Sequence, residues 1–484
     1  MATAISSTND VVPLWLNGKA VTSPDLAKFA VKSAAQNGKI IHYAQASSEA
    51  TAIEACDSAA AAFHTWRRVP ASKRQEIFTK AADIMLSRRE QFVQSQVEET
   101  SASQFWADLN VTVAAGHIRE IASRITSMLG VIPESKMDYA LAFREPLGAT
   151  LAIPPWNAAL ILGARAVVTP LAAGCTVVLK ASELSPKTHH LLVQALFDAG
   201  LPKNAVNIVQ VDRQNAAAVT EALISHKAIR KVEFIGSANV GRIIGAVAGK
   251  YLKPVLMELG GKCAAIVLED ANLEDAAMKI IAGAFNHHGQ VCFSTERVYV
   301  VKEVAERFIS LLKDQAKKFP AGGAVTQQGA QTAIEKLIDA EQKGAQFLLG
   351  GAKFLDEAAA SLVPSIITNV TKDMVIFDEE SFGPSISVYV VEDQKEALRL
   401  VNGSDYGLVG AVHTMDMHRG VQIAKQMEVG IAHVNGATSY DESTLPLGGS
   451  KNSGWGRTNG GWGLEGFTEL KVVTVSMKPG MPAW

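Results

Sequence analysis

The sequence has few cysteines, no excess of charge of either sign and no long unbroken hydrophobic run. Its four cysteines, Cys56, Cys175, Cys263 and Cys292, lie far apart and form no CxxC pair. This number and spacing exclude the disulfide framework of a small secreted domain and the ligand set of a structural zinc site. We therefore expect reduced thiols, one of them a candidate reactive group, and no metal site.

The charges are balanced, with 46 Lys and Arg against 48 Asp and Glu and a net charge of -2. A chain without a basic excess is not expected to bind nucleic acid or an anionic membrane surface. The longest apolar stretch, residues 161–171, is interrupted by Arg165 and Pro170. A membrane span needs about 20 predominantly apolar residues, so none is predicted.

The remaining composition is that of a large globular protein: 484 residues, 48% hydrophobic and 19% charged. Disordered chains have low hydrophobicity and high net charge, and this sequence has neither. At about 150 residues for each domain, the length predicts about three domains. The first residues, MATAISSTNDVVPLWL, contain neither a basic leader nor a long apolar segment, so we expect a cytosolic protein.

Periodicity along the chain predicts an α/β fold. Residues 44–124 are rich in Ala, Glu, Lys, Gln and Leu at helical spacing and predict a helical opening section. Residues 176–259 then alternate β-branched strands with helical segments, and residues 264–319 repeat this alternation. Repeated βαβ units predict a parallel sheet with right-handed crossovers, here in two successive α/β domains.

Two segments lie outside this rhythm. Residues 130–148 contain strand-like pieces divided by Pro133, and they predict a protruding hairpin that pairs with an element outside the main sheet. The Gly- and Trp-rich residues 448–467 predict a loop, and residues 471–477 predict a last strand.

Cys292 is the cysteine with the context of a reactive thiol. It lies between a helix that ends in polar residues and a following strand, whereas Cys175 stands in an apolar run typical of a core cysteine. On its own, Cys292 is also compatible with a buried core position. His287 and His288 are near it in sequence, but no orienting acid is evident, so we predict a structural role for both.

Several other residues are candidates for binding or catalysis, each with a plain structural alternative. Glu258 ends an apolar strand and precedes two glycines. It is a candidate proton-accepting carboxylate, and the alternative is a solvated residue at the end of a strand. Gly236 and Gly241 frame a strand-to-helix turn that suits a phosphate but also suits tight packing alone. Lys180 and Glu183 follow a strand at the edge where doubly wound sheets bind ligands. They are candidate contacts to a ribose, and the alternative is that both are solvated surface charges.

Taken together and in this order, these motifs resemble the aldehyde dehydrogenase superfamily over nearly the whole chain. The matching segments are REPLG (144–148), PPWN (154–157), KASE (180–183), FIGS with Gly241, ELGGK (258–262), GQVC (289–292) and EESFGP (379–384). The resemblance implies an α/β fold with a Rossmann-type parallel-sheet cofactor domain, an α/β catalytic domain and a small β oligomerisation element. It places the cofactor domain at residues 1–124 and 149–257, the catalytic domain at residues 258–447, and the oligomerisation element at residues 125–148 and 466–484.

The resemblance also implies roles for individual residues. Cys292 is the nucleophile that adds to the aldehyde carbon, and Asn157 with the Cys292 backbone N–H stabilises the oxyanion. Glu258 activates the water that hydrolyses the resulting thioester. The implied cofactor is NAD, because a carboxylate at Glu183 would repel a 2′-phosphate, although NADP stays possible. The implied cofactor-binding residues are Trp156, Lys180, Glu183, Gly236, Ser237, Gly241, Glu380 and Phe382.

A narrower similarity, over residues 155–165 and 430–457, is to the branch that oxidises aromatic aldehydes such as salicylaldehyde, benzaldehyde and vanillin. It predicts oxidation of salicylaldehyde to salicylate by a homodimer or homotetramer. Trp106, Arg165 and Tyr440 are the candidate pocket residues, although Trp106 also fits a core position and Arg165 also fits an ion pair. The alternatives are an aliphatic or broad specificity, a coenzyme A-acylating enzyme, and a binding protein without catalysis.

Overall fold

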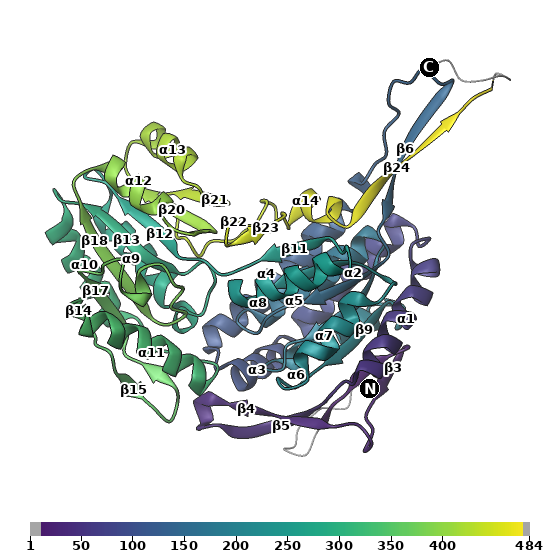
Figure 1. Cartoon of the computed structure of the whole chain (residues 1–484), viewed down its shortest axis with the longest axis horizontal. Helices are drawn as coiled ribbons and strands as arrows, with labels where there is room; N and C mark the ends of the chain where they lie inside the picture. Colours follow the sequence, from purple (N-terminus) through teal and green to yellow (C-terminus); the bar gives the residue numbers. More distant parts are fainter. Residues whose placement is uncertain (1–10, 478–484) are drawn as a thin grey trace.

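Two large sheets organise the computed structural model, which describes residues 11–477 (Figure 1). The first sheet has eight strands, of which the five central ones are parallel and the short edge strands are antiparallel. In spatial order they are β23 (Gly454–Trp455), β11 (Val255–Glu258), β10 (Ile229–Ile235), β7 (Ala149–Ile153), β8 (Thr176–Ala181), β9 (Val206–Gln210), β2 (Leu14–Leu16) and β3 (Lys19–Val21).

Helices cover both faces of this sheet because its strands alternate apolar side chains between the two sides. Val178 faces one hydrophobic cluster, and its neighbours Val177 and Leu179 face the other. The first cluster contains α1 (Glu49–Trp66), α7 (Ala216–Ser225) and α8 (Ala238–Lys250). The second contains α2 (Ala71–Ser87), α3 (Arg89–Thr100), α4 (Gln104–Arg124), α5 (Ala159–Ala173) and α6 (Pro186–Asp198). Every residue of α5 is buried, so this helix is the centre of its half.

The second sheet has seven strands, parallel except for the edge strand β14. In spatial order they are β14 (Gln346–Leu349), β17 (Ser365–Thr368), β18 (Ser385–Val391), β13 (Thr295–Val301), β12 (Cys263–Val267), β20 (Val409–His413) and β21 (Ile431–Val434). Its helices are α9 (Leu273–Phe285), α10 (Ala305–Lys318), α11 (Gln327–Gln342), α12 (Gln394–Asn402) and α13 (Met417–Gln426). The two predicted βαβ series are therefore confirmed as two separate sheets.

Small sheets complete the chain. A three-stranded sheet joins β1 (Val11–Val12), β5 (Lys39–Gln45) and β4 (Lys28–Ser33). Two short ribbons pair β15 (Phe354–Asp356) with β16 (Ser361–Leu362) and β19 (Tyr406–Gly407) with β22 (Ser450–Lys451). The opening section that was predicted to be helical is helical from Glu49 onward.

The prediction of a hairpin within residues 130–148 is wrong. The single strand β6 (Tyr139–Pro146) pairs antiparallel with the last strand, β24 (Thr468–Val475), over eight residues. The pairing between two parts of residues 130–148 is limited to an isolated antiparallel bridge between Val131 and Ala142. The prediction of a partner outside the main sheet is confirmed, because β6 and β24 form an arm that projects from the body (Figure 1). The predicted oligomerisation segment 466–484 extends past residue 477, outside the described residues.

The loop predicted at 448–467 is also wrong in part, since it contains β22, β23 and α14 (Gly460–Glu465). Leu464 and Phe467 are buried, and α14 packs on α4 and α5. Tertiary contacts therefore give a helix to a glycine-rich stretch whose intrinsic propensity disfavours one.

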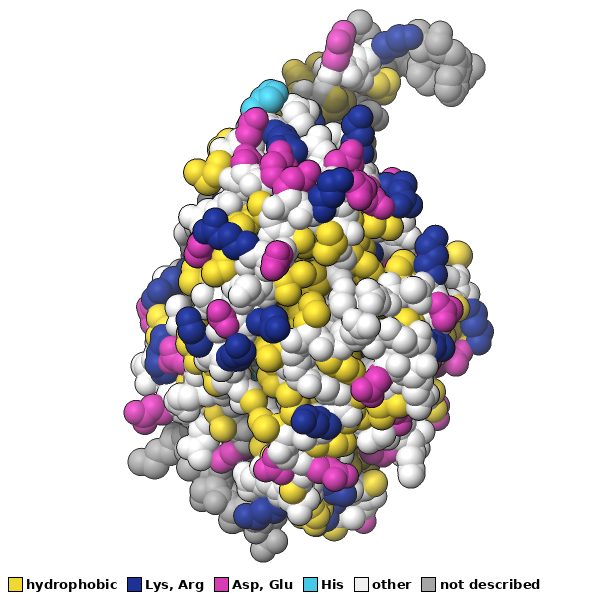
Figure 2. All heavy atoms as spheres, turned by 90° about the vertical axis from the view of Figure 1, so that its left-hand side faces the viewer, with side chains coloured by type: hydrophobic (Ala, Val, Ile, Leu, Met, Phe, Trp, Pro, Cys, Tyr) yellow, Lys and Arg dark blue, Asp and Glu magenta, His cyan; other side chains and the backbone are white. Residues whose placement is uncertain are grey.

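The side of the molecule that Figure 2 shows, where the domain of the seven-stranded sheet lies, carries Lys, Arg, Asp and Glu side chains interspersed with apolar ones. No continuous patch of one sign is visible on this face, in agreement with the balanced net charge. Within residues 11–477, no helix combines the length and apolar character needed to cross a membrane.

Candidate active site

Cys292 lies on a turn that is held against the segment following β11. The chain reaches it through residues 286–289, where His287 and His288 have left-handed backbone angles, with φ of 48° and 59°. A Cβ atom added to Gly261 would lie 2.7 Å from the Cys292 carbonyl oxygen, closer than real contacts allow. Glycine at this position therefore permits the close approach of the Cys292 turn to the end of β11.

Asn157 is fixed beside the same turn by hydrogen bonds on both sides. Its side-chain Nδ2 donates to the backbone oxygen of Gln290 at 3.0 Å, and its own backbone oxygen accepts from Trp106 Nε1 at 3.1 Å. The Trp106 ring stacks on His287, with centroids 5.4 Å apart and an interplanar angle of 13°. One N–H of the Asn157 amide is used by Gln290, which leaves the second available for an oxygen at the site.

Glu258, at the end of β11, is ion-paired inside the protein. Arg165 of α5 donates from Nη1 to Glu258 Oε2 at 3.4 Å, and its Nη2 contacts Asp441 Oδ2. The Arg165 side chain is 1% exposed and that of Glu258 is 8% exposed. Asp441 also accepts from Asn459 Nδ2 at 3.2 Å. Arg165 thus bridges two acids, the ion-pair alternative that the sequence left open.

Burial raises the pKa of Glu258, the charge of Arg165 opposes this rise, and Asp441 adds to it. A buried carboxylate with a raised pKa is a stronger proton acceptor than a solvated one, while the adjacent cation preserves its charged form. The Glu258 Oε1 atom has no hydrogen-bond partner among the described residues. This oxygen is the one that is available to a water molecule.

Burial raises the pKa of the Cys292 thiol well above its usual range, and the negative charges of Glu380 and Glu258 raise it further. The thiol is therefore protonated at neutral pH in this arrangement. Because the thiolate is the nucleophilic form, attack by Cys292 requires a group that takes the proton, and Glu258 is a carboxylate close enough to influence it.

Two of the predicted cofactor residues, Ser237 and Glu380, line a cleft between the two sheets. A cavity of about 560 Å³ is bordered by Ser237, Arg242, Lys336 and Glu380. Ser237 caps the N-terminus of α8, and its Oγ accepts from Val240 N at 3.3 Å. The exposed N–H groups of a helix N-terminus favour an anion such as a pyrophosphate. This end of α8 therefore suits the phosphates of a dinucleotide.

Two glycines permit close packing around this cleft. A Cβ at Gly241 would lie 2.6 Å from the Leu259 side chain, so glycine lets α8 approach the sheet. A Cβ at Gly260 would lie 2.4 Å from Glu380 Oε2. The Glu380 carboxylate accepts from Gly261 N at 3.1 Å, and its burial raises its pKa to about 8.

The remaining predicted cofactor residues do not line this cavity, and their local contacts are as follows. The Trp156 and Phe382 rings meet edge to face with centroids 5.7 Å apart. Lys180 is the last residue but one of β8, with Glu183 close by, and burial lowers the Lys180 pKa while the Glu183 charge raises it. Gly236 follows β10 and precedes the Ser237 cap. A helix N-terminus, a carboxylate and aromatic rings are groups that suit the phosphate, ribose and ring parts of a nucleotide.

The other candidates lie at different depths. Tyr440 is 51% exposed, with its hydroxyl donating to Glu442 and its ring against His433. His288 Nε2 accepts from the backbone N–H of Leu362 at 3.2 Å, in keeping with a structural role. Trp106 is nearly buried and contacts Asn157, so it is both a core residue and a neighbour of the site.

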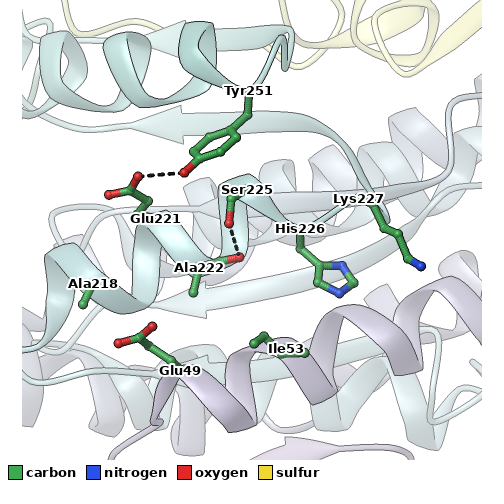
Figure 3. Close-up of a pocket in the computed structure, with 9 residues that line it drawn as sticks. All are labelled: Glu49, Ile53, Ala218, Glu221, Ala222, Ser225, His226, Lys227 and Tyr251. Atoms are coloured by element: carbon green, nitrogen blue, oxygen red, sulfur yellow. Dashed lines mark hydrogen bonds between the residues drawn. The ribbon is translucent and has the colours of Figure 1, made fainter.

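A cavity of about 650 Å³ lies elsewhere, between α1, α7 and the C-terminal end of α8 (Figure 3). Its lining includes Glu49, Glu221, His226 and Tyr251, and Tyr251 donates to Glu221. The helix α8 separates this cavity from the Ser237 cap by about 20 Å. Among residues 11–477, no group of three or more His, Cys, Asp and Glu residues is arranged to hold a metal ion.

Asp441 and Gln290 belong to the site but were not predicted from the sequence. Asp441 completes the ion pair of Arg165, and the backbone of Gln290 positions Asn157. Gln290 stands in the GQVC motif, so its closeness to Cys292 was visible in the sequence. Nothing in the sequence linked Asp441 to Arg165, because 276 residues separate them.

Comparison with known proteins agrees with this geometry. The aldehyde dehydrogenase family matches residues 21–473. Vanillin dehydrogenase of Pseudomonas sp. strain HR199 is 40% identical over 480 residues, covering 97% of this chain and 98% of that protein. Salicylaldehyde dehydrogenase of Pseudomonas putida is 38% identical over 438 residues, covering 88% and 90% respectively.

Among solved structures, a salicylaldehyde dehydrogenase from Pseudomonas putida G7, complexed with salicylaldehyde, superposes with a TM-score of 0.94. It is 34% identical and covers 99% of this chain and 100% of that one. The α/β fold expected from the resemblance is thereby confirmed. Sequence, fold and the elements that surround Cys292 lead to one conclusion: the chain is a member of the aldehyde dehydrogenase family and an oxidoreductase that acts on aldehydes.

Proposed function

We propose that this enzyme oxidises an aromatic aldehyde, with salicylaldehyde as the first choice, to its carboxylic acid with NAD. The observation that carries the proposal is the grouping of Cys292, Asn157 and Glu258 around one turn. The similarity to vanillin and salicylaldehyde dehydrogenases supports an aromatic substrate.

In the proposed first step, the Cys292 sulfur bonds to the aldehyde carbon and its proton leaves to a base. The carbonyl oxygen becomes an oxyanion, to which the free N–H of Asn157 and the backbone N–H of Cys292 donate. Such preorganised donors commonly contribute roughly 100- to 1,000-fold to the rate, because they are aligned before charge develops. The hydrogen bond from Asn157 to the Gln290 backbone supplies this alignment.

The tetrahedral adduct must lose a hydride to become a thioester, and a bound nicotinamide dinucleotide supplies the acceptor. Glu258 then takes a proton from a water molecule whose oxygen attacks the thioester carbon. The carbon–sulfur bond breaks, the carboxylic acid leaves, and the departing Cys292 sulfur receives the proton that Glu258 took from the water molecule. The unpartnered Oε1 of Glu258 supports this role, since Arg165 holds only the other oxygen.

The family uses NAD or NADP, and we propose NAD because of Glu183. A carboxylate near the adenosine ribose would repel a 2′-phosphate, and close like charges cost several kcal/mol. We expect Glu183→Ala to raise the ratio of kcat/KM for NADP to that for NAD at least about tenfold, measured by initial rates with each cofactor. Glu183→Asp keeps the charge and should keep the NAD preference. An unchanged ratio in Glu183→Ala would remove the proposed role.

We also propose a cytoplasmic homodimer or homotetramer assembled through the β6–β24 arm. The arm exposes large apolar side chains, with Leu470 at 55% and Val472 at 61% exposure. Exposed apolar area on a projecting two-stranded ribbon favours burial against another subunit. The domain boundaries 1–124 with 149–257, 258–447, and 125–148 with 466–484 are part of the same proposal.

A substrate panel tests the proposed specificity. Salicylaldehyde, benzaldehyde, vanillin and hexanal are compared at one saturating NAD concentration, with NADH absorbance as the readout. We expect kcat/KM for the best aromatic aldehyde to exceed that for hexanal at least about tenfold, since specificity is a ratio of catalytic efficiencies. Equal or higher efficiency with hexanal contradicts the aromatic assignment. A strict need for coenzyme A would instead indicate an acylating enzyme.

A further inference from the structure

Glu233 is a buried carboxyl group that the proposed reaction does not use. It lies in the middle of β10, 2% exposed. Neither of its carboxylate oxygens has a hydrogen-bond partner among the described residues. Buried polar groups are nearly always paired, and an unpaired buried carboxylate is especially costly, so this side chain requires an explanation.

Glu233 lies next to the proposed base. β10 and β11 are parallel, and Glu233 is in register with Leu256, two residues before Glu258. Because side chains alternate along a strand, Glu258 lies on the same sheet face, one diagonal position away. Arg165 approaches from α5 on that face, and Glu233, Glu258 and Arg165 influence one another electrostatically. The two carboxyl groups therefore form a buried pair.

The charges around this pair do not balance when all groups are ionised. The ionisable neighbours are Lys231, on the same face of β10, Arg165 and Asp441. Two cations then face three carboxylates, since Glu233 and Glu258 join Asp441. One added proton makes the cluster neutral, and in a medium from which water is excluded the neutral arrangement is favoured.

Three further groups face this cluster and carry no charge at neutral pH. Cys292 is near Glu258, and burial raises the pKa of its thiol well above the usual range. His117 of α4 is next to Arg165, and burial, with the charge of Arg165, lowers its pKa to about 3. Cys175 is next to Lys231, and burial raises its pKa to about 11. The balance is therefore decided among the three carboxyl groups and the two cations.

The contacts show which carboxyl group is the best holder of the extra proton. Glu258 accepts from Arg165, and Asp441 accepts from Arg165 and Asn459. Both are thus stabilised in the ionised form by donors, whereas Glu233 has none. In a close pair of carboxyl groups, the one without donors keeps the proton.

We propose that Glu233 is a positioning residue that holds a proton in the resting enzyme and so leaves Glu258 as the ionised member of the pair. The proposal rests on the role of Glu258 as the base that activates water. Burial and the neighbouring charge of Glu258 raise the pKa of Glu233 to about 8, in agreement with a protonated group at neutral pH. As the pH rises above about 8, Glu233 ionises. Its negative charge then makes Glu258 a stronger proton acceptor.

Infrared spectroscopy tests the proton directly, without turnover. We expect the wild-type enzyme at neutral pH to show a C=O stretch of protonated buried carboxyl groups, and this band should weaken in Glu233→Gln, where only the contribution of Glu380 remains. Glu380 also has a raised pKa, so the same band is measured in Glu380→Gln. There it should still be present at neutral pH, and it should disappear as the pH rises through the range near 8, where Glu233 ionises. This arm needs no variant at 233. Absence of the band in Glu380→Gln overturns the proposal.

The pH dependence of thioester hydrolysis identifies which carboxyl group holds the proton. In Glu233→Gln, a neutral amide replaces a neutral acid, so the acid limb of the rate should shift by less than about half a pH unit. The further rise of the wild-type rate near pH 8 should be lost. Glu221→Gln, which removes an exposed carboxylate at the distant cavity, should keep the wild-type profile (Figure 3).

If Glu258 held the proton instead, removing the charge of Glu233 would move the acid limb at least about one unit downward. That shift, or a Glu233→Gln profile identical to wild type at high pH, overturns the proposal. If Glu233→Gln does not fold, Glu233→Leu carries the same comparison, since it is also uncharged. Failure of the proposed function is recognised separately, because Glu258→Gln would then retain steady turnover whatever the result at 233.

Discussion

Cys292→Ala is expected to lose essentially all aldehyde dehydrogenase activity, a fall of at least about 10⁴-fold in kcat. Without the sulfur, the aldehyde carbon cannot become tetrahedral on the enzyme, and a trigonal aldehyde carbonyl is not in a state from which hydride can leave. Steady-state formation of NADH with salicylaldehyde measures the loss. Mass spectrometry should also find no acyl adduct on the variant protein.

The other cysteines provide the control for this experiment. Cys263 Sγ contacts the Cys292 backbone oxygen at 3.8 Å, but its side chain is buried, and burial raises its pKa to about 12. The Cys292 side chain is partly exposed whereas that of Cys263 is closed off from a substrate, so Cys263 cannot replace Cys292 as nucleophile. Cys56→Ala, on the buried face of α1, should retain the wild-type rate with a modest loss of stability. Substantial turnover in Cys292→Ala contradicts the role assigned to Cys292. A loss of activity in Cys56→Ala would show that the assay responds to reduced stability and not to the missing nucleophile.

Glu258→Gln is expected to form the thioester and then stop. The amide keeps the shape of the side chain, and Arg165 keeps Asp441 as a charged partner, so the buried cation is not left alone. We expect a burst of NADH of about one equivalent for each active site, followed by a steady rate reduced by roughly 100- to 10,000-fold. Rapid mixing with an NADH readout measures both phases, and the acyl group should be detectable on Cys292.

Hydroxylamine distinguishes a missing base from a distorted site. It is a strong nucleophile that attacks a thioester without a general base, so it should restore turnover in Glu258→Gln. The thioester is intact in that case, and only the activation of water has been removed. A wild-type steady rate in Glu258→Gln, or a variant with no burst, contradicts the role of this carboxylate in hydrolysis.

The sequence by itself determined the local elements and the residues with reactive groups. β-branched runs such as 176–180 gave strands, and the helical pattern of 273–286 gave α9, because period and propensity act over a few neighbouring residues. The motif order was also sufficient to identify the family, since its spacing is a property of the linear chain. The sequence failed at 130–148 and 448–467, where the outcome depended on a partner far along the chain.

Only the tertiary structure decided how the reactive groups affect one another. Arg165 meets Glu258 and Asp441 because α5 is completely buried between elements that are distant in sequence. Parallel pairing of β10 with β11 places Glu233 beside Glu258, which neither residue's own neighbourhood indicated. Electrostatic coupling depends on distance and on the exclusion of water, and both are set by packing. For this reason the chain identifies the acid and the thiol, whereas the fold fixes their protonation.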